Sequence, residues 1–190
     1  MPAVVGRLRP GGERPLGSPN QQTRQPAETP HLFSEIRQPN KGQYILVPSH
    51  SASSRDYVPI GLMDNSVIAT NALLIMPGGG LYEFGVINSI IHNDWLRVVG
   101  GRIKSDYRYS VSLVYNNFPW PDVTDAQRKQ IEALAEDVLM ARENYPDKSL
   151  ADLYDPATMP DDLKAAHKAL DAAVERLYRS RPFRDADERL

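Results

Sequence analysis

The sequence predicts an α+β fold, in which a small mixed α/β domain is followed by an α-helical domain. Three observations predict it. Short apolar runs bounded by Gly and Pro dominate the first part, whereas apolar residues recur at three- and four-residue steps in the last part. The net charge also changes, because residues 122–190 carry eleven Lys and Arg against sixteen Asp and Glu. With 190 residues and 41% hydrophobic residues, the chain can bury a core.

The first 30 residues have a different composition. They include six Pro and four Gly and no aromatic residue. Such a stretch buries too little apolar surface to offset its chain entropy. We therefore predict a disordered tail over residues 1–30, a mixed domain over 31–121 and a helical domain over 122–190.

The mixed domain is expected to contain four strands and one helix. The strands are predicted at residues 44–47, 57–62, 72–76 and 111–115, the second at a sheet edge because Pro59 cannot donate a backbone hydrogen bond. Apolar residues from Phe84 to Val98 lie on one helical face, and Gly100 and Gly101 end that helix.

The helical domain shows clear start signals. Thr124 followed by Gln127 has the pattern of a capping box, and the helix that it opens stops before Pro146. A short helical turn begins near Ser149, and another helix follows Pro160. These helices are predicted to form an antiparallel pair, with His167 on its apolar side as a core histidine.

Composition excludes several classes of function. The chain has no cysteine, so disulfides, Cys-zinc sites and thiol nucleophiles are ruled out, and a reducing bacterial cytoplasm is the expected location. No apolar run reaches the length of a membrane span. The four histidines lack metal-ligand spacing, so no metal site is predicted. A net charge of −2 limits any nucleic-acid surface to a local patch.

That patch is predicted at residues 97–110. A solvated basic loop would explain these charges, but a DNA-binding loop would also use the aromatic residues interleaved with them. In this interpretation arginines bind phosphates, and tyrosines pack or stack in support. The arginines are Arg97, Arg102 and Arg108, and the tyrosines are Tyr107 and Tyr109.

Lys104 and Asp106 are the predicted base-reading residues. Alternate residues of an extended segment point the same way, so both side chains can face one base pair. Lys donates to guanine O6 and N7, and Asp accepts from the cytosine N4 amino group. The pair therefore matches both edges of a single G·C pair.

Two other functions are considered. Asn116 to Trp120 has the composition, but not the order, of the Asn-Pro-Pro-Tyr loop of amino-methyltransferases, and no glycine motif for S-adenosylmethionine precedes it. An intact small nucleic-acid methyltransferase is thus an alternative, although a buried Phe-Pro-Trp corner explains the segment better. A protein-interaction module that docks through the acidic helices is another. No catalytic residue is predicted.

Residues from Ile36 to about Arg184 resemble the C-terminal part of the MmeI-like (type IIL) restriction–modification proteins, and the first 30 residues lie outside the resemblance. Six segments carry it, in the same order. They are residues 55–61, 81–86, 101–110, 114–121, 153–156 and 159–160.

The resemblance implies a target-recognition domain followed by a C-terminal helical domain. It supports Lys104 and Asp106 as base readers, because the matching loop of the family reads a base pair of the target site. The family's nuclease and its S-adenosylmethionine-dependent adenine methyltransferase correspond to parts that are not in this sequence. Expected partners are duplex DNA and the methyltransferase and nuclease domains, or chain, of the parent enzyme; neither a membrane nor a cofactor bound by this chain is expected.

Overall fold

A computed structural model describes residues 16–24, 37 and 39–190. Residues 38–190 form one compact unit, and the preceding residues are a separate unit. Most of the predicted tail therefore lies outside the described residues. Its described part contains one helical turn, α2, at Gln21–Arg24.

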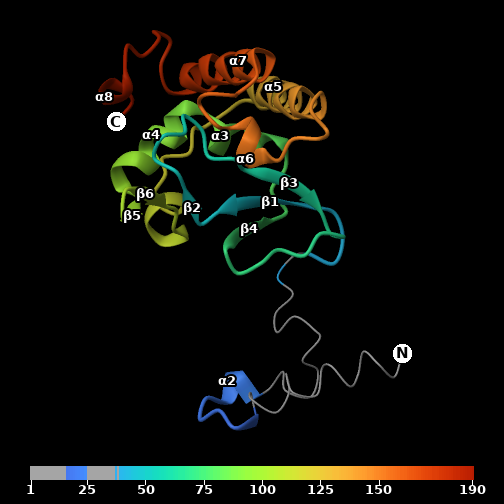
Figure 1. Ribbon diagram of the computed structural model, residues 1–190. Coiled ribbons are helices and arrows are strands. Elements are labelled where there is room, and N and C mark those ends of the chain that lie inside the picture. Colours follow the sequence, from blue (N-terminus) through green and yellow to red (C-terminus); the bar gives the residue numbers. More distant parts are fainter. Residues whose placement is uncertain (1–15, 25–36, 38) are drawn as a thin grey trace. The chain divides into compact units, whose positions relative to one another are not determined.

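The compact unit contains both sheets and helices, which confirms the predicted α+β class (Figure 1). Its strands are β1 (Gln43–Pro48), β2 (His50–Ser51), β3 (Gly61–Asp64), β4 (Leu73–Pro77), β5 (Gly101–Ile103) and β6 (Asp106–Arg108). Its helical segments are α3 (Leu81–Asn88), α4 (Ile90–Val99), η2 (Val111–Tyr115), α5 (Asp125–Glu143), α6 (Leu150–Leu153), α7 (Asp161–Tyr178) and α8 (Ala186–Arg189).

Strand β1 is the centre of the larger sheet. It pairs antiparallel with β3 on one side and with β4 on the other. Residues Tyr44–Val47 are buried in succession, as expected for a strand that has apolar neighbours on both faces. A second small sheet has the order β2-β6-β5, also antiparallel.

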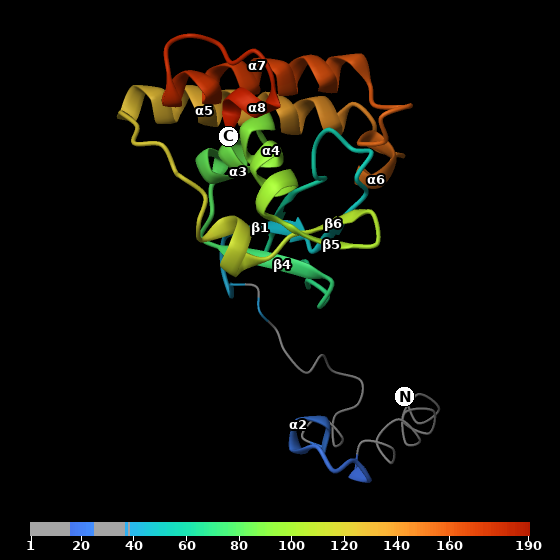
Figure 2. The ribbon, with the colours of Figure 1, turned by 90° about the vertical axis from the view of Figure 1, so that its left-hand side faces the viewer.

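Helices cover one face of the larger sheet. In Figures 1 and 2, α3 and α4 lie between the sheet and the helices α5 and α7. The sheet contributes Ile45 and Val47 to a buried cluster, and α3 contributes Phe84 and Ile87. Helix α3 thus links the sheet core to the helical core.

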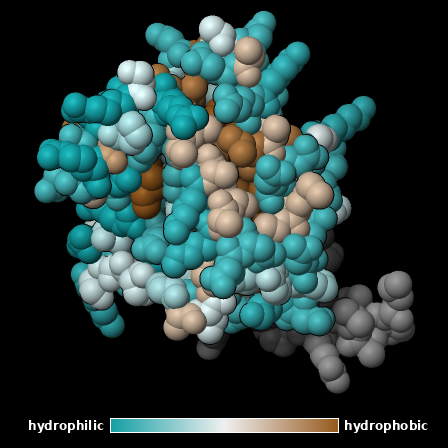
Figure 3. Space-filling model, turned by 90° about the horizontal axis from the view of Figure 1, so that it is seen from above, coloured by the Kyte–Doolittle hydropathy of each residue, from teal (hydrophilic) through white to brown (hydrophobic). Residues whose placement is uncertain are grey.

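The antiparallel pair α5 and α7 forms the outer layer (Figure 2). The predicted start signals of α5 and of the short helix α6 are confirmed. The Thr124 hydroxyl accepts from Gln127 N, and the Ser149 hydroxyl accepts from Asp152 N. His167 is fully buried, as predicted for a core histidine. Seen from above, hydrophilic side chains cover most of this layer and apolar side chains show mainly near its centre (Figure 3).

The predicted single helix over Phe84–Val98 is wrong, because the helix is interrupted at Ser89. Ser89 is extended, with φ −69° and ψ 158°. Its hydroxyl donates to the carbonyl of Val86, and the next amide, Ile90 N, donates to the Asp171 carboxylate 2.7 Å away. The Asp171 side chain of α7 therefore satisfies the first backbone amide of α4.

The predicted strand at residues 111–115 is also wrong, since η2 is a π-helical turn. Asn116 N donates to Val111 O over 2.9 Å, and the Ser110 hydroxyl accepts from Leu113 N. Only Val114 is buried, and its carbonyl accepts from Trp95 Nε1. A short apolar run rich in valine has a strand-like composition, but here the Ser110 hydroxyl caps a helical turn and Val114 is its buried residue.

The second predicted strand begins later than expected. Residues 57–60 precede β3, and Ile60 N donates to Val58 O of the same segment and not to a neighbouring strand. Val58 N donates to the Asn93 side chain at 2.8 Å instead of to a neighbouring strand. This segment is therefore attached to α4.

Side chains join the parts on either side of residues 121 and 122. Arg142 of α5 donates to Ile60 O at 2.8 Å, and Tyr57 donates to the Asp171 carboxylate of α7 at 2.6 Å. Burial raises the pKa of Asp171 to about 7. The two predicted domains thus pack together within a single compact unit.

Candidate nucleic-acid interface

The predicted base-reading residues lie at the tip of the hairpin β5–β6. Ile103 pairs with Asp106, which leaves Lys104 and Ser105 as the turn. The prediction that Lys104 and Asp106 belong to one extended segment is therefore wrong: one lies in the turn and the other starts β6. Both are nevertheless exposed at the tip of the same hairpin.

Lys104 has an unusual backbone conformation. Its φ is +56°, and it is the only non-glycine residue with positive φ in the described part of the chain. Glycine usually takes this place in a two-residue hairpin turn. A lysine there has a backbone cost, and such costs are more common at functional sites.

Two of the three predicted phosphate-binding arginines lie on the same hairpin and are exposed. The Arg102 guanidinium lies 4.4 Å from the Tyr107 ring centroid and donates to Ser105 O at 3.0 Å. Within the described residues, no hydrogen bond or ion pair involves the side chains of Arg108 and Lys104. Tyr107 is half-buried and supports Arg102, in agreement with a packing role.

Tyr109 lies at the inner end of the hairpin and is buried. Its hydroxyl is 2.8 Å from His92 Nε2, and burial raises its pKa. His92 is itself buried, and burial lowers its pKa to about 3, so it is neutral near pH 7. Tyr109 therefore anchors the hairpin and does not present its ring for stacking on a base.

Arg97 differs from Arg102 and Arg108 in the partners that its guanidinium contacts. It lies in the last turn of α4, forms an ion pair with Asp94 and donates to the carbonyls of Arg55 and Asp56 at 3.2 and 2.6 Å. Asp94 is buried and also pairs with Arg189 at 2.9 Å. This geometry does not support the predicted phosphate contact of Arg97, because its guanidinium already has protein acceptors.

Asp106 has a contact that the sequence did not indicate. Its Oδ1 accepts from Ser53 N at 3.3 Å, across 53 positions of sequence. Ser53 and Arg189 were missed because they act through long-range contacts, which no local signal in the sequence indicates. Asp94 was missed although it precedes Arg97 by three positions on one helix, a spacing that favours an ion pair.

The segment compared with a methyltransferase loop has a structural role. The Asn117 amide donates to the carbonyls of Ser112 and Leu113, and Phe118 is buried edge-on against His92, with ring centroids 4.4 Å apart. An amide that caps η2 is not free to hold a base. These contacts favour the predicted Phe-Pro-Trp corner over a catalytic loop.

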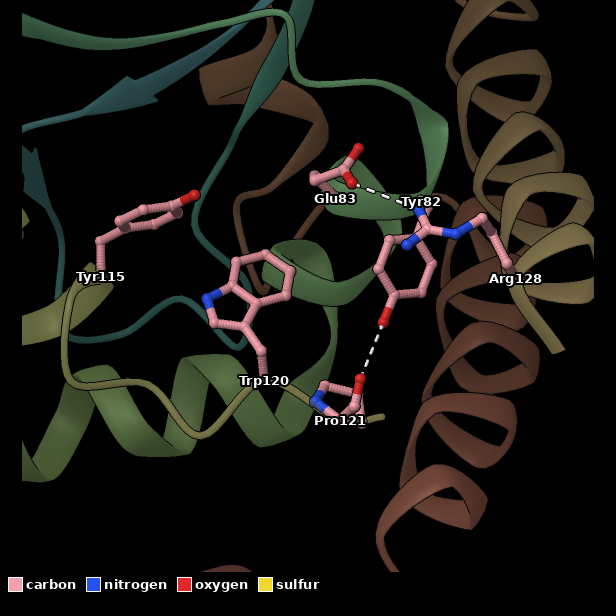
Figure 4. A pocket seen from close by; sticks show the side chains of 6 residues that line it. All are labelled: Tyr82, Glu83, Tyr115, Trp120, Pro121 and Arg128. Atoms are coloured by element: carbon pink, nitrogen blue, oxygen red, sulfur yellow. Dashed lines mark hydrogen bonds and ion pairs between the residues drawn. The ribbon is translucent and has the colours of Figure 1, made fainter. Parts of the chain in front are cut away.

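A pocket of about 350 Å³ lies beside this corner (Figure 4). The Arg128 guanidinium lies 3.9 Å from the Tyr82 ring centroid and pairs with Glu83 at 3.3 Å. Tyr82 also donates to Pro121 O at 3.4 Å. Tyr115 and Trp120 complete the wall. These interactions pair Arg128 with Glu83 and direct the Tyr82 hydroxyl to the backbone.

Two further features concern ligands and membranes. Over residues 16–24, 37 and 39–190, no three His, Asp or Glu side chains come together as metal ligands. The helices of the same residues include none that is long and apolar enough to cross a membrane.

The sequence matches the family model described as the target recognition domain of MmeI over residues 3–122, and that of the MmeI C-terminal domain over residues 123–190. The first match begins at residue 3, so the expectation that residues 1–30 lie outside the resemblance is wrong.

Two related proteins are much longer than this chain. DNA methyltransferase A of Bacillus subtilis (strain 168) is 38% identical over 173 residues, which are 91% of this chain and 20% of that protein. A solved structure of the type IIL restriction–modification enzyme MmeI in complex with DNA is 45% identical, with a TM-score of 0.89 over 100% of this chain and 25% of that one. The chain therefore belongs to the MmeI family, whose target recognition and C-terminal domains it matches from residue 3 to its last residue.

Proposed function

We propose that this chain gives base-pair specificity to a DNA adenine methyltransferase and restriction enzyme of the MmeI family. The exposed tip of the hairpin β5–β6 carries the proposal. It exposes both Lys104, in the turn, and Asp106, at the start of β6, and a two-stranded β-ribbon fits the major groove of duplex DNA. Both related proteins are DNA enzymes by description, one solved with DNA bound.

In this proposal one G·C pair is read at both edges. Lys104 donates to guanine O6 and N7, and Asp106 accepts from the cytosine amino group. Asp106 Oδ1 already accepts from Ser53 N, so Oδ2 is the oxygen left for the base. Arg102 and Arg108, exposed on the same hairpin, supply phosphate contacts.

The proposal assigns the chemistry to another part of the parent enzyme. Residues 31–121 read the DNA and residues 122–190 support them. S-adenosylmethionine and methyl transfer belong to the methyltransferase domain, and the chain works beside it in the bacterial cytoplasm. Calorimetry separates this from the small-methyltransferase alternative: binding of S-adenosylmethionine by this chain would contradict our assignment.

A charge exchange tests the reading of the base pair. In Lys104→Glu with Asp106→Arg, Arg addresses guanine and Glu addresses cytosine from exchanged positions. The chain is mixed at low salt with a duplex library randomised over the site, and bound sequences are counted. We expect the preferred pair at one position to change from G·C to C·G, and each single change to cost about 1–3 kcal/mol of discrimination.

The matched control is Lys164→Glu with Asp147→Arg, which makes the same charge changes at exposed positions on other elements. It should keep the preference of the unaltered chain. Arg108→Ala should weaken binding to all sequences alike and lower the slope of log Kd against log salt by about 0.9. An exchange variant with unchanged base preference at every position would refute the assignment of Lys104 and Asp106.

A further inference from the structure

The segment 52–58, which we call the brace, lies between the hairpin tip and the helices. It follows β2, which pairs with β6. Its first part is a turn closed by Arg55 N donating to Ala52 O at 3.2 Å. Its last part is buried at Tyr57 and Val58. The brace is therefore placed to connect the predicted base reader with the helical layer.

At its outer end the brace holds Asp106. Ser53 N donates to Asp106 Oδ1 at 3.3 Å, although both residues are exposed. An exposed aspartate otherwise rotates freely about its side-chain bonds. A hydrogen bond to one oxygen limits this rotation and fixes the direction of the other oxygen. Direction matters for reading a base, because hydrogen bonds weaken steeply when they are misaligned.

At its inner end the brace is held by several polar contacts. The Arg97 guanidinium donates to the carbonyls of Arg55 and Asp56. Arg55 in turn donates to Ala151 O of α6 at 3.3 Å, and Tyr57 donates to Asp171 of α7. Every contact comes from α4 or from the C-terminal helices.

Arg97 is held in place by a buried ion-pair network. Asp94, with a side chain only 3% exposed, pairs with both Arg97 and Arg189. Arg189 of α8 also pairs with Glu175 of α7 at 2.5 Å. Two guanidinium groups offset the cost of burying the Asp94 carboxylate. Contacts thus run without a gap from α7 and α8 through Arg97 and the brace to Asp106.

We infer that Arg97 is a positioning residue for base recognition, which acts through the brace to direct the Asp106 carboxylate. The inference rests on the proposed function of the hairpin. It replaces the phosphate contact expected from the sequence, since Arg97 would have to leave Asp94 and two carbonyls to reach DNA. It also gives the C-terminal helices a function, which is to set the direction of a base-reading side chain.

The two roles of Arg97 predict different results. A lost phosphate contact weakens binding to every sequence and lowers the salt slope by about 0.9. A lost positioning contact reduces discrimination at the one position that Asp106 reads and leaves the salt slope unchanged. Base preference and salt slope therefore distinguish them.

The experiment uses the full chain and the randomised duplex library. For Arg97→Ala we expect the preference at the Asp106 position to fall about fivefold or more, with other positions and the salt slope unchanged. Arg97→Lys should recover part of this preference. Arg181→Ala removes an equal charge from an exposed site and should match the unaltered chain. A uniform loss with a reduced slope would overturn the inference.

Ser53→Pro tests the last step without disturbing Arg97. Ser53 is the second residue of the turn 52–55, a place where proline is favoured, and proline lacks the amide that Asp106 accepts from. Ser53→Ala keeps the amide and is the control. We expect only the proline variant to lose the preference at the Asp106 position.

The outcomes separate the inference from the proposed function. If the unaltered chain prefers no sequence, both fail. If it has a preference that Arg97→Ala and Ser53→Pro both retain, DNA reading stands and the positioning role is refuted. Should Arg97→Ala fail to fold, as judged by circular dichroism, Arg97→Lys takes its place, and an unchanged preference at the Asp106 position in that variant refutes the positioning role.

Discussion

Acid should destabilise this protein through its buried histidines. His92 and His167 are both buried, and burial lowers the pKa of each to about 3. His167 Nε2 lies 2.6 Å from the Tyr154 hydroxyl, and its ring stacks on Tyr57 with centroids 4.1 Å apart. Protonation would place a charge in this core near Arg142, so the folded state resists it.

The size of the effect follows from proton linkage. An unfolded histidine has a pKa near 6.5, so between about pH 4 and 6 the unfolded state binds one more proton per histidine. Each then lowers the free energy of unfolding by about 1.4 kcal/mol per pH unit of acidification. Asp171 opposes this change, because its pKa is raised to about 7 and the folded state holds the extra proton. Two histidines against one aspartate leave a net loss of about 1.4 kcal/mol per unit.

Urea unfolding followed by tryptophan fluorescence at several pH values between 5 and 6 measures this slope, because Glu188, whose pKa is lowered to about 2, is then largely ionised in both states. The variant His167→Gln should reduce the slope to near zero. Asp171→Asn removes the opposing group and should about double it, to roughly 2.7 kcal/mol per unit. Equal slopes in the unaltered chain and in His167→Gln would refute the reasoning, because His167 would then titrate alike in both states.

Two further predictions concern packing and capping. A Cβ on Gly85 would lie 2.8 Å from Ile131 Cγ2 and 3.2 Å from Ala135 Cβ. Gly85→Ala should therefore push α3 from α5 and lower the free energy of unfolding by about 1–2 kcal/mol, although alanine has a better helix propensity than glycine. A raised urea midpoint would contradict this. Thr124→Ala removes the cap of α5 and should lower the free energy of unfolding by about 1 kcal/mol, whereas Thr124→Ser should leave that free energy unchanged. Equal urea midpoints for the two variants would show that the cap contributes nothing.

Local signals predicted the helix starts correctly because the relevant contacts are local. Thr124 and Gln127, or Ser149 and Asp152, are three residues apart and satisfy each other's backbone groups. The hydrophobic period of α5 and α7 likewise needs only the neighbouring turns. The same reasoning failed at Ser89, because Ile90 N at the start of α4 donates a hydrogen bond to Asp171 of α7, which lies 81 positions further along the chain.

The candidate site shows the same division between local and distant contacts. The run of charges at residues 97–110 indicated an exposed basic segment, and Arg102 and Arg108 are exposed, but the hairpin β5–β6 was not predicted. The run of charges also placed Arg97 in one group with Arg102 and Arg108, although only Arg97 has an acidic residue three positions earlier on the same helix. Arg97 differs from the others because Asp94 is within its own helix and the brace passes its end.

The charge of the chain makes orientation of the reading groups important for the proposed function. With a net charge of −2 and few exposed cations on the hairpin, phosphate contacts can supply only weak, salt-sensitive binding. Discrimination must then come from a few directional hydrogen bonds, which lose strength when their donors or acceptors are free to turn. Fixing the direction of Asp106 before DNA binds reduces that loss. A compact helical layer that holds the brace is therefore a physical reason for target recognition and C-terminal domains to fold together.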